Sequence, residues 1–200
     1  IWQHSLGYSK QVGNLIFNNE ESCGVKVATS GDLNAQGRFW YDYDNDLIQI
    51  YSAYNPASYY TNIEAALQRQ LADVYGHIYL RFEYLDFRYS GEGTIFGDAD
   101  YIQVWRVEAS FNGGAFIDPG GGTRQGGGIG TWDNASFWDV QGCRISNEYD
   151  AGATNQGSTV TSVHDIIWRS NIIEKCEYNF EFWERGGECY NVWFEHNTCA

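Results

Sequence analysis

Apolar and polar positions alternate along much of this chain in short segments. Five of these segments recur in the second half and begin 24 to 35 residues apart; they cover 77–87, 101–111, 136–146, 165–176 and 191–199. Each segment starts with alternation, as Ile166 and Trp168 do against Ile167 and Arg169. Each then passes a polar position and resumes with apolar residues. A period of two residues is typical of a strand with one buried face.

A second set of short strands is predicted between these segments, at 93–97, 128–132, 151–155 and 180–184. Gly, Asn and Asp separate the pieces, and these residues favour chain corners that need a positive φ. Repeats built from two or three short strands indicate a solenoid, in which each turn lies about 4.8 Å above the last. We therefore predict an all-β fold, a right-handed parallel β-helix, with its coils over residues 73–200.

Residues 1–72 follow a different pattern. The segments GNLIFN and GVKVA read as strands of earlier coils. Residues 38–52 alternate on both sides of Asp44 and Asn45, which predicts a hairpin. Residues 61–71 begin with Thr61 and Glu64 in capping-box spacing and continue with helical spacing, which predicts a helix. We expect early coil strands with a hairpin-plus-helix insert that plugs one end of the stack. No similar cap follows Cys199, so the uncapped coil is expected to allow end-to-end self-association.

Two stretches of the chain are nearly alike, EYDAGATNQG at 148–157 and EYNFEFWERG at 177–186. Aligned without gaps, they would place Tyr149 over Tyr178 and Ala151 over Phe180. The alignment predicts three stacks across successive turns. They are an inward stack of Ile129, Ala151 and Phe180, an outward stack of Trp132, Thr154 and Trp183, and a strand-end stack of Asp133, Asn155 and Glu184.

The charge of the chain excludes some partners. The formal net charge is −14 over 200 residues, enough chain for one domain. Nucleic-acid binding requires clusters of Lys and Arg, so a nucleic-acid partner is not expected. No apolar run approaches the roughly 18 residues of a membrane span, so no membrane partner is expected either. The five cysteines contain no Cys-x-x-Cys pair, which argues against zinc and allows at most one or two disulfides.

The run GIGTWDNASFWDVQGCRISNEYDAGATNQGS, followed by WRSNIIEKCEYNFEFW, resembles bacterial right-handed parallel β-helix repeat proteins of the pectate-lyase-like superfamily. The resemblance implies an extracellular, carbohydrate-active protein, either a glycoside hydrolase or a polysaccharide lyase. The same fold also serves tailspikes and adhesins, so these motifs identify the fold more than the activity.

A candidate site follows from the predicted stacks. Trp132 and Trp183 would stack on sugar rings, and the amide of Asn155 would bind hydroxyl groups. Arg124 is a further candidate for substrate binding. Carboxylates two turns apart are separated by roughly 9.6 Å, close to the spacing of an inverting glycosidase pair. The predicted catalytic residues are Asp133 and Glu184, with Asp150 and Glu181 as further candidates. We expect a glycoside hydrolase that acts on a neutral or weakly charged polysaccharide.

Two alternatives remain open on the sequence. A polysaccharide lyase would need Ca²⁺ or arginine to neutralise a uronate, and a base such as His164. Ca²⁺ is therefore expected only for a lyase, and no metal ligands are predicted. Arg124 belongs to the excursion 118–128, expected to be a mobile loop over one face. The other alternative is a non-catalytic structural or adhesive protein, such as a tailspike-like fibre or filament subunit. In either case the resemblance and composition predict an extracellular location.

Overall fold

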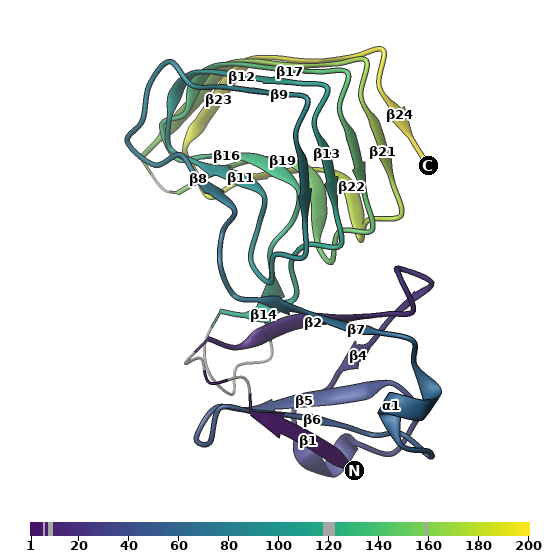
Figure 1. Ribbon diagram of the computed structural model, residues 1–200. Coiled ribbons are helices and arrows are strands. Elements are labelled where there is room, and N and C mark those ends of the chain that lie inside the picture. Colours follow the sequence, from purple (N-terminus) through teal and green to yellow (C-terminus); the bar gives the residue numbers. More distant parts are fainter. Residues whose placement is uncertain (6, 8–9, 118–122, 159) are drawn as a thin grey trace.

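Residues 72–199 form three parallel sheets that share one repeating order (Figure 1). The computed structural model describes residues 1–5, 7, 10–117, 123–158 and 160–200. Sheet 1 contains β8 (Ala72–Asp73), β11 (Ile95–Gly97), β16 (Ile129–Trp132), β19 (Ala151–Gly157) and β22 (Tyr178–Glu184). Sheet 2 contains β9 (Arg81–Glu83), β12 (Asp100–Trp105), β17 (Ser136–Gln141), β20 (Ser162–Arg169) and β23 (Glu188–Glu195). Sheet 3 contains β10 (Asp86–Arg88), β13 (Glu108–Ser110), β18 (Arg144–Ser146), β21 (Ile172–Glu174) and β24 (Thr198–Cys199).

The chain visits sheets 1, 2 and 3 in turn and then repeats. Each strand pairs in parallel with its counterpart one repeat later. This path is compatible with a β-helix-like solenoid, and the predicted all-β, parallel character is confirmed. Each of the five apolar segments found in the sequence overlaps one strand of sheet 2 and the following strand of sheet 3.

The corner between sheets 2 and 3 uses the same backbone conformation in every turn. Its residues have φ between 51° and 65°, and they are Tyr84, Arg106, Gly142, Ser170 and His196. A positive φ is uncommon for residues other than Gly, Asn and Asp. Corner geometry is therefore imposed by the stacked turns, and residue type alone would not have located this corner.

The interior of the coil is apolar with a few bonded polar groups. Trp138 and Trp168 are the largest fully buried side chains. Trp138 Nε1 donates to Ala99 O (2.7 Å), and Trp168 Nε1 donates to Asn155 Oδ1 (3.2 Å). These bonds satisfy the indole N–H groups, as burial requires.

The register between successive turns differs from the ungapped alignment by two residues. Ala153 pairs with Phe180, and Tyr178 pairs with Ala151 instead of Tyr149. The predicted pairs of Ala151 with Phe180 and of Tyr149 with Tyr178 are therefore wrong. Interior packing sets the register: a side chain at Gly152 would lie 2.5 Å from Ile173 Cγ2. Because an even shift preserves the face of every residue, Phe180 still points inward and Trp183 outward.

The N-terminal part forms two small sheets that lie beside the coil (Figure 1). One contains β1 (Trp2–Ser5), β6 (Leu47–Ile50), β5 (Arg38–Asp42) and β4 (Val25–Lys26); the other contains β3 (Ser22–Cys23), β2 (Val12–Phe17) and β7 (Ile63–Leu67). The hairpin predicted at 38–52 is confirmed by the antiparallel pair of β5 and β6. The segments read as early coil strands belong instead to these small sheets.

The helix predicted at 61–71 is wrong. Residues of this segment form β7, which is antiparallel to β2. The Thr61 hydroxyl and backbone N–H both donate to Asn18 Oδ1, so Thr61 does not cap a helix. The helices of the described chain are the single turn α1 (Pro56–Tyr59), capped by Asn55, and the 3-10 turn η1 (Ser30–Asp32). Pairing with the buried strand β2 overrides the helical pattern, and neither helix of the described residues plugs the coil.

Candidate functional site

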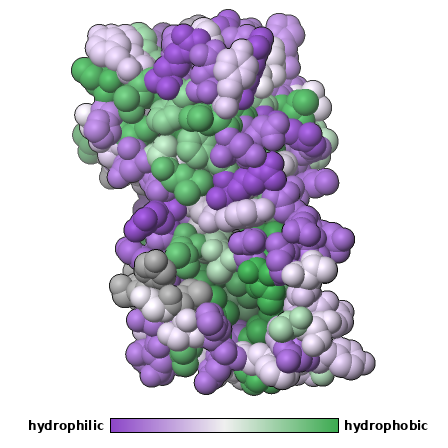
Figure 2. Space-filling model, in the orientation of Figure 1, coloured by the Kyte–Doolittle hydropathy of each residue, from purple (hydrophilic) through white to green (hydrophobic). Residues whose placement is uncertain are grey.

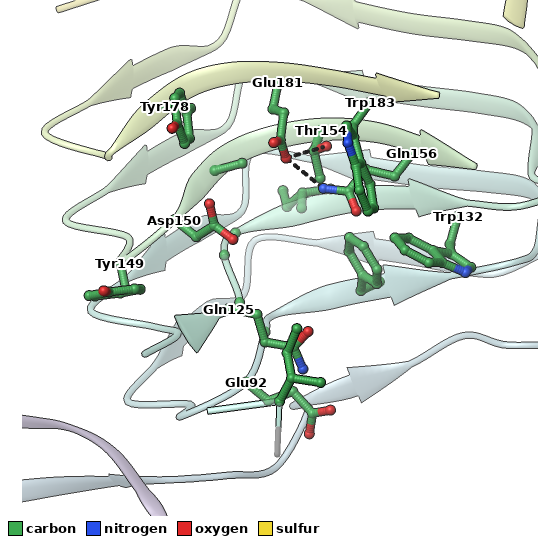
Figure 3. A pocket seen from close by; sticks show the side chains of 18 of the residues that line it. Glu92, Gln125, Trp132, Tyr149, Asp150, Thr154, Gln156, Tyr178, Glu181 and Trp183 are labelled. Atoms are coloured by element: carbon green, nitrogen blue, oxygen red, sulfur yellow. Dashed lines mark hydrogen bonds between the residues drawn. The ribbon is translucent and has the colours of Figure 1, made fainter. Parts of the chain in front are cut away.

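A groove of about 790 Å³ follows the outer face of sheet 1 (Figure 3). Strands β11, β16, β19 and β22 supply its wall, because alternate residues of a strand point outward. The short hairpin of β14 (Ala115–Phe116) and β15 (Arg124–Gln125) supplies one side, together with Gly126, Gly127 and Gly128. The groove therefore combines residues from four successive turns with a hairpin that projects from the coil.

Three aromatic rings, from β11, β16 and β22, line one part of this groove. The ring centroids of Phe96 and Trp132 are 5.8 Å apart, and those of Trp132 and Trp183 are 6.3 Å apart. Gly130 makes room for this arrangement, since a Cβ there would lie 2.2 Å from the Phe96 ring. Trp183 is 38% exposed, so part of its indole is open to a ligand. Exposed indole faces of this kind can stack against the C–H faces of sugars.

Four carboxyl groups also line the groove, those of Glu92, Asp150, Glu177 and Glu181, and Figure 3 shows Asp150 and Glu181 on the side of β19 and β22. Glu181 accepts hydrogen bonds from Gln156 Nε2 (2.6 Å) and Thr154 Oγ1 (3.4 Å), which hold its carboxylate in place. Asp150 lies just before β19. Burial, and then the charges of Glu181 and Glu177, raise the pKa of Asp150 to about 6. The site thus pairs a held carboxylate with a carboxyl group that keeps its proton in mild acid.

Arg124 is fixed in the groove wall. Its Nε donates to Gly114 O (2.8 Å), and its Nη2 donates to Gly13 O (3.0 Å). Its guanidinium lies 3.5 Å from the centroid of the Tyr149 ring. The mobile loop expected at 118–128 falls partly on residues 118–122, which lie outside the described residues. Arg124 itself is anchored by three contacts, contrary to that expectation.

The groove brings together five of the eight residues predicted from the sequence, namely Arg124, Trp132, Asp150, Glu181 and Trp183. Asp133 and Glu184 do not line it; they follow Trp132 and Trp183 at the strand ends. Asn155 is fully buried and accepts hydrogen bonds from Thr131 Oγ1 (2.9 Å) and Trp168 Nε1 (3.2 Å). Its predicted substrate contact is therefore wrong, because its place in β19 directs it inward.

Several lining residues were not found from the sequence. Gln156 pairs with both Trp132 and Trp183, and it was missed because the alignment was two residues out of register. Phe96 and Tyr178 could have been found from strand alternation in the correct register. His164, the candidate lyase base, is in sheet 2 beside Asp165 (Nδ1 to Oδ2, 2.8 Å) and does not line the groove.

The structure also bears on disulfides, metal-binding groups and membrane-spanning helices. All five cysteines are free in the structure. Among the described residues, no three or more His, Cys, Asp and Glu side chains form a group suited to a metal ion. In the same part of the chain, no helix has the length and apolar character needed to cross a membrane.

No family model, no curated protein and no solved structure matches this chain. The groove is therefore the basis for a proposed function.

Proposed function

We propose that this protein binds a neutral or weakly charged polysaccharide in the groove of sheet 1 and hydrolyses it. The observation that carries the proposal is the meeting of aromatic rings with Asp150 and Glu181 in one groove of about 790 Å³. This volume is within the range of ligand sites. The proposal includes a right-handed β-helix of the pectate-lyase-like kind and an extracellular location, both expected from the sequence resemblance.

Asp150 is assigned the role of proton donor and Glu181 that of base. A general acid works best when its pKa is near the working pH, and the pKa of Asp150 is about 6. Glu181 accepts two hydrogen bonds, from Gln156 and Thr154, which orient its carboxylate in the groove. The groove favours this pair over Asp133 and Glu184, the pair favoured by the sequence, because those two lie outside the lining.

The test is hydrolysis of a panel of neutral and weakly charged polysaccharides, followed by the release of reducing ends. We expect at least one substrate, with activity that falls as the pH rises above about 6, where Asp150 loses its proton. Asp150→Asn and Glu181→Gln should each lower kcat by about 100-fold or more. Glu188→Gln, an exposed carboxylate away from the lining, serves as the matched control and should retain activity.

Two results would contradict the hydrolase. Unsaturated products would indicate a lyase instead. A carbohydrate site in this groove would be excluded if no glycan of the panel gave products and none changed the tryptophan fluorescence.

A second candidate function is structural, through self-association of coil ends. In the turn that contains β22 and β23, Phe182 is 51% exposed and Phe194 is 39% exposed. Strands β22, β23 and β24 each pair on one side among the described strands. Figure 2 shows apolar surface among polar residues over the coil. Sedimentation over a range of concentrations tests this candidate. The wild type should form dimers or larger assemblies, and Phe182→Lys should remain monomeric. A protein that stays monomeric at every concentration would exclude it.

A further inference from the structure

The two ends of the sheet 1 groove differ in chemistry (Figure 3). Asp150 and Glu177 lie just before β19 and β22, and we call this part of the groove the acidic end. Trp132 and Trp183 lie toward the other end of their strands, and we call this part the aromatic end. Both tryptophans pair with Gln156, six residues after Asp150, which is roughly 20 Å along an extended strand. A ligand that contacts both ends must therefore be as long as an oligosaccharide.

The carboxyl groups of the acidic end are neighbours along the coil. Ala151 pairs with Tyr178, so the residues before them, Asp150 and Glu177, hold equivalent positions in successive turns. Tyr178 N donates to Asp150 O (3.2 Å), which continues the pairing up to this point. Successive turns are about 4.8 Å apart, so one small group between these two carboxyl groups can contact both.

The carboxyl groups of the groove form no ion pair with any basic side chain of the described chain. The two arginines of the lining lie against aromatic rings instead. Arg124 Cζ is 3.5 Å from the centroid of the Tyr149 ring, and Arg185 Cζ is 4.2 Å from that of the Trp183 ring. Four carboxyl groups and two guanidinium groups give the described lining a formal charge of −2 when all are ionised. The groove therefore attracts positive charge.

Hydrogen bonding and charge within the groove point the same way. Both hydrogen bonds to Glu181, from Thr154 and Gln156, end on Oε2, so Oε1 accepts none from the described residues. Burial, and then the charges of Glu181 and Glu177, raise the pKa of Asp150, which shows that these carboxyl groups repel one another. A positively charged ligand would relieve this repulsion.

An ammonium group suits the acidic end because it is attracted to aromatic rings as well as to carboxylates. Tyr178 directly follows Glu177, lines the groove and is 50% exposed, so its ring is open beside the carboxyl groups. The rings of the aromatic end suit the C–H faces of sugars. A sugar chain that carries ammonium groups matches both ends of the groove.

We propose that the groove selects a glycan whose sugars carry free amino groups, with an ammonium group held by Glu177 next to Asp150 and sugar rings on Trp132 and Trp183. This inference rests on the proposed glycan groove and narrows its ligand to amino sugars. Asp150 keeps its role as proton donor, because a protonated carboxyl group can still accept a hydrogen bond from the ammonium group.

The charge of the groove separates three kinds of glycan. An amino sugar whose nitrogen is acetylated has lost its positive charge and keeps only the contacts of its rings and hydroxyl groups. A uronate brings like charge next to Glu177 and is repelled. The expected order of affinity is therefore amino sugar first, acetylated amino sugar second and uronate last.

The experiment compares two hexasaccharides of the same linkage, one of glucosamine and one of N-acetylglucosamine, by titration of the tryptophan fluorescence of the whole chain. At about pH 5.5 the free amino groups are protonated. The glucosamine form should bind about 10-fold more tightly at low salt, since several ammonium contacts add up. Most of this preference should be lost in about 1 M NaCl, which screens exposed charges.

Matched variants assign the preference to the acidic end. Glu177→Gln should reduce it to about 3-fold or less and leave the Kd of the acetylated form unchanged. A merely structural effect would weaken both forms equally. Glu188→Gln, which changes an exposed carboxylate outside the lining, should keep the full preference.

The outcomes distinguish this inference from the hydrolase. Equal affinity for the two hexasaccharides in the wild type would overturn the inference, even if a neutral glycan is hydrolysed. A preference as large in Glu177→Gln as in the wild type would assign it to the general acidic surface and overturn the inference as well. Selective binding of the glucosamine form without hydrolysis of any glycan would support the inference and exclude the hydrolase.

Discussion

Glu148 lies inside the coil with an exposed fraction of 3%, although its counterpart in the sequence repeat, Glu177, is exposed. Asn112 Nδ2 donates to Glu148 Oε1 (2.9 Å), and Oε2 has no partner among the described residues. Burial raises the pKa of Glu148 to about 8, so the carboxyl group is neutral at pH 7. At the scale of the residue, the acidic side chain of Glu148 is tolerated inside the coil because it is protonated.

Glu148→Gln should change how stability depends on pH. The folded pKa of about 8 exceeds the unfolded value of 4.5, so the wild type loses stability as the pH rises from 4.5 through 8. The variant keeps the acceptor for Asn112 and lacks this loss. We expect it to gain on the order of 3 kcal/mol over the wild type between these two pH values. Urea unfolding across this pH range measures the change.

Glu177→Gln is the control for Glu148→Gln, since it changes the same residue type at the equivalent exposed position. It should leave the loss of stability between pH 6 and pH 8 nearly unchanged; below pH 6 it also removes a charge that raises the pKa of Asp150. Parallel pH profiles for wild type and Glu148→Gln would show that Glu148 is not a protonated interior group.

At the scale of the element, the hairpin of β14 and β15 shapes the groove because glycines let it approach the coil. Gly126 has φ of +102°, and a Cβ there would lie 1.6 Å from Glu92 O. A Cβ at Gly127 would lie 1.9 Å from Ala151 O. Backbone therefore packs directly against backbone, which holds Arg124 and Gln125 at the groove edge.

Gly126→Ala should destabilise this contact by about 3 kcal/mol or more, because the methyl group clashes with backbone and φ is unfavourable for alanine. Thermal unfolding measures the loss, and binding of a glycan found in the panel should weaken as well. Gly93→Ala is the matched control, since its Cβ would meet its nearest neighbour, Gly127 O, at 3.5 Å. Equal stability of the two variants would contradict close packing at Gly126.

At the scale of the whole molecule, Gln11 joins the N-terminal sheets to the coil. Its Nε2 donates to Gln68 Oε1 (2.9 Å) and Phe116 O (2.6 Å). Its Oε1 accepts from Lys26 Nζ (2.8 Å), Tyr43 Oη (2.7 Å) and Phe116 N (2.9 Å). The buried amide of Gln11 therefore connects β4 and its neighbours with β14. Burial also lowers the pKa of its partner Lys26 to about 7.

Gln11→Ala should loosen this connection at a cost of about 3 kcal/mol, because buried donors and acceptors lose their partners. Hydrogen exchange should become faster at Phe116 and remain slow in the core strands of sheet 2. Gln36→Ala is the control, since Gln36 bonds to Ser52 and Tyr60 within the N-terminal part. Unchanged exchange at Phe116 in Gln11→Ala would show that other contacts hold the two parts together.

Local pattern was a good guide to strands and a poor guide to faces and partners. The alternation at 136–146 predicted β17 and β18, and the alternation around Asp44 predicted the hairpin of β5 and β6. The helical spacing at 61–71 gave a wrong prediction, because this segment pairs with β2. The spacing of residues along the chain does not show which distant strand a segment will pair with. Of the candidate site, the paired tryptophans were foreseen, whereas Gln156 and the burial of Asn155 were not.

The sequence by itself determined the strands, their repetition and the acidic, aromatic surface, because alternation, turn residues and charge are local properties of the chain. Tertiary structure decided the two-residue shift between turns, the inward place of Asn155, and the meeting of Asp150 with Glu181. The physical reason is that these features depend on how side chains such as Ile173 of sheet 3 fit against Gly152 of sheet 1 across the interior. That fit exists only after the chain has closed on itself.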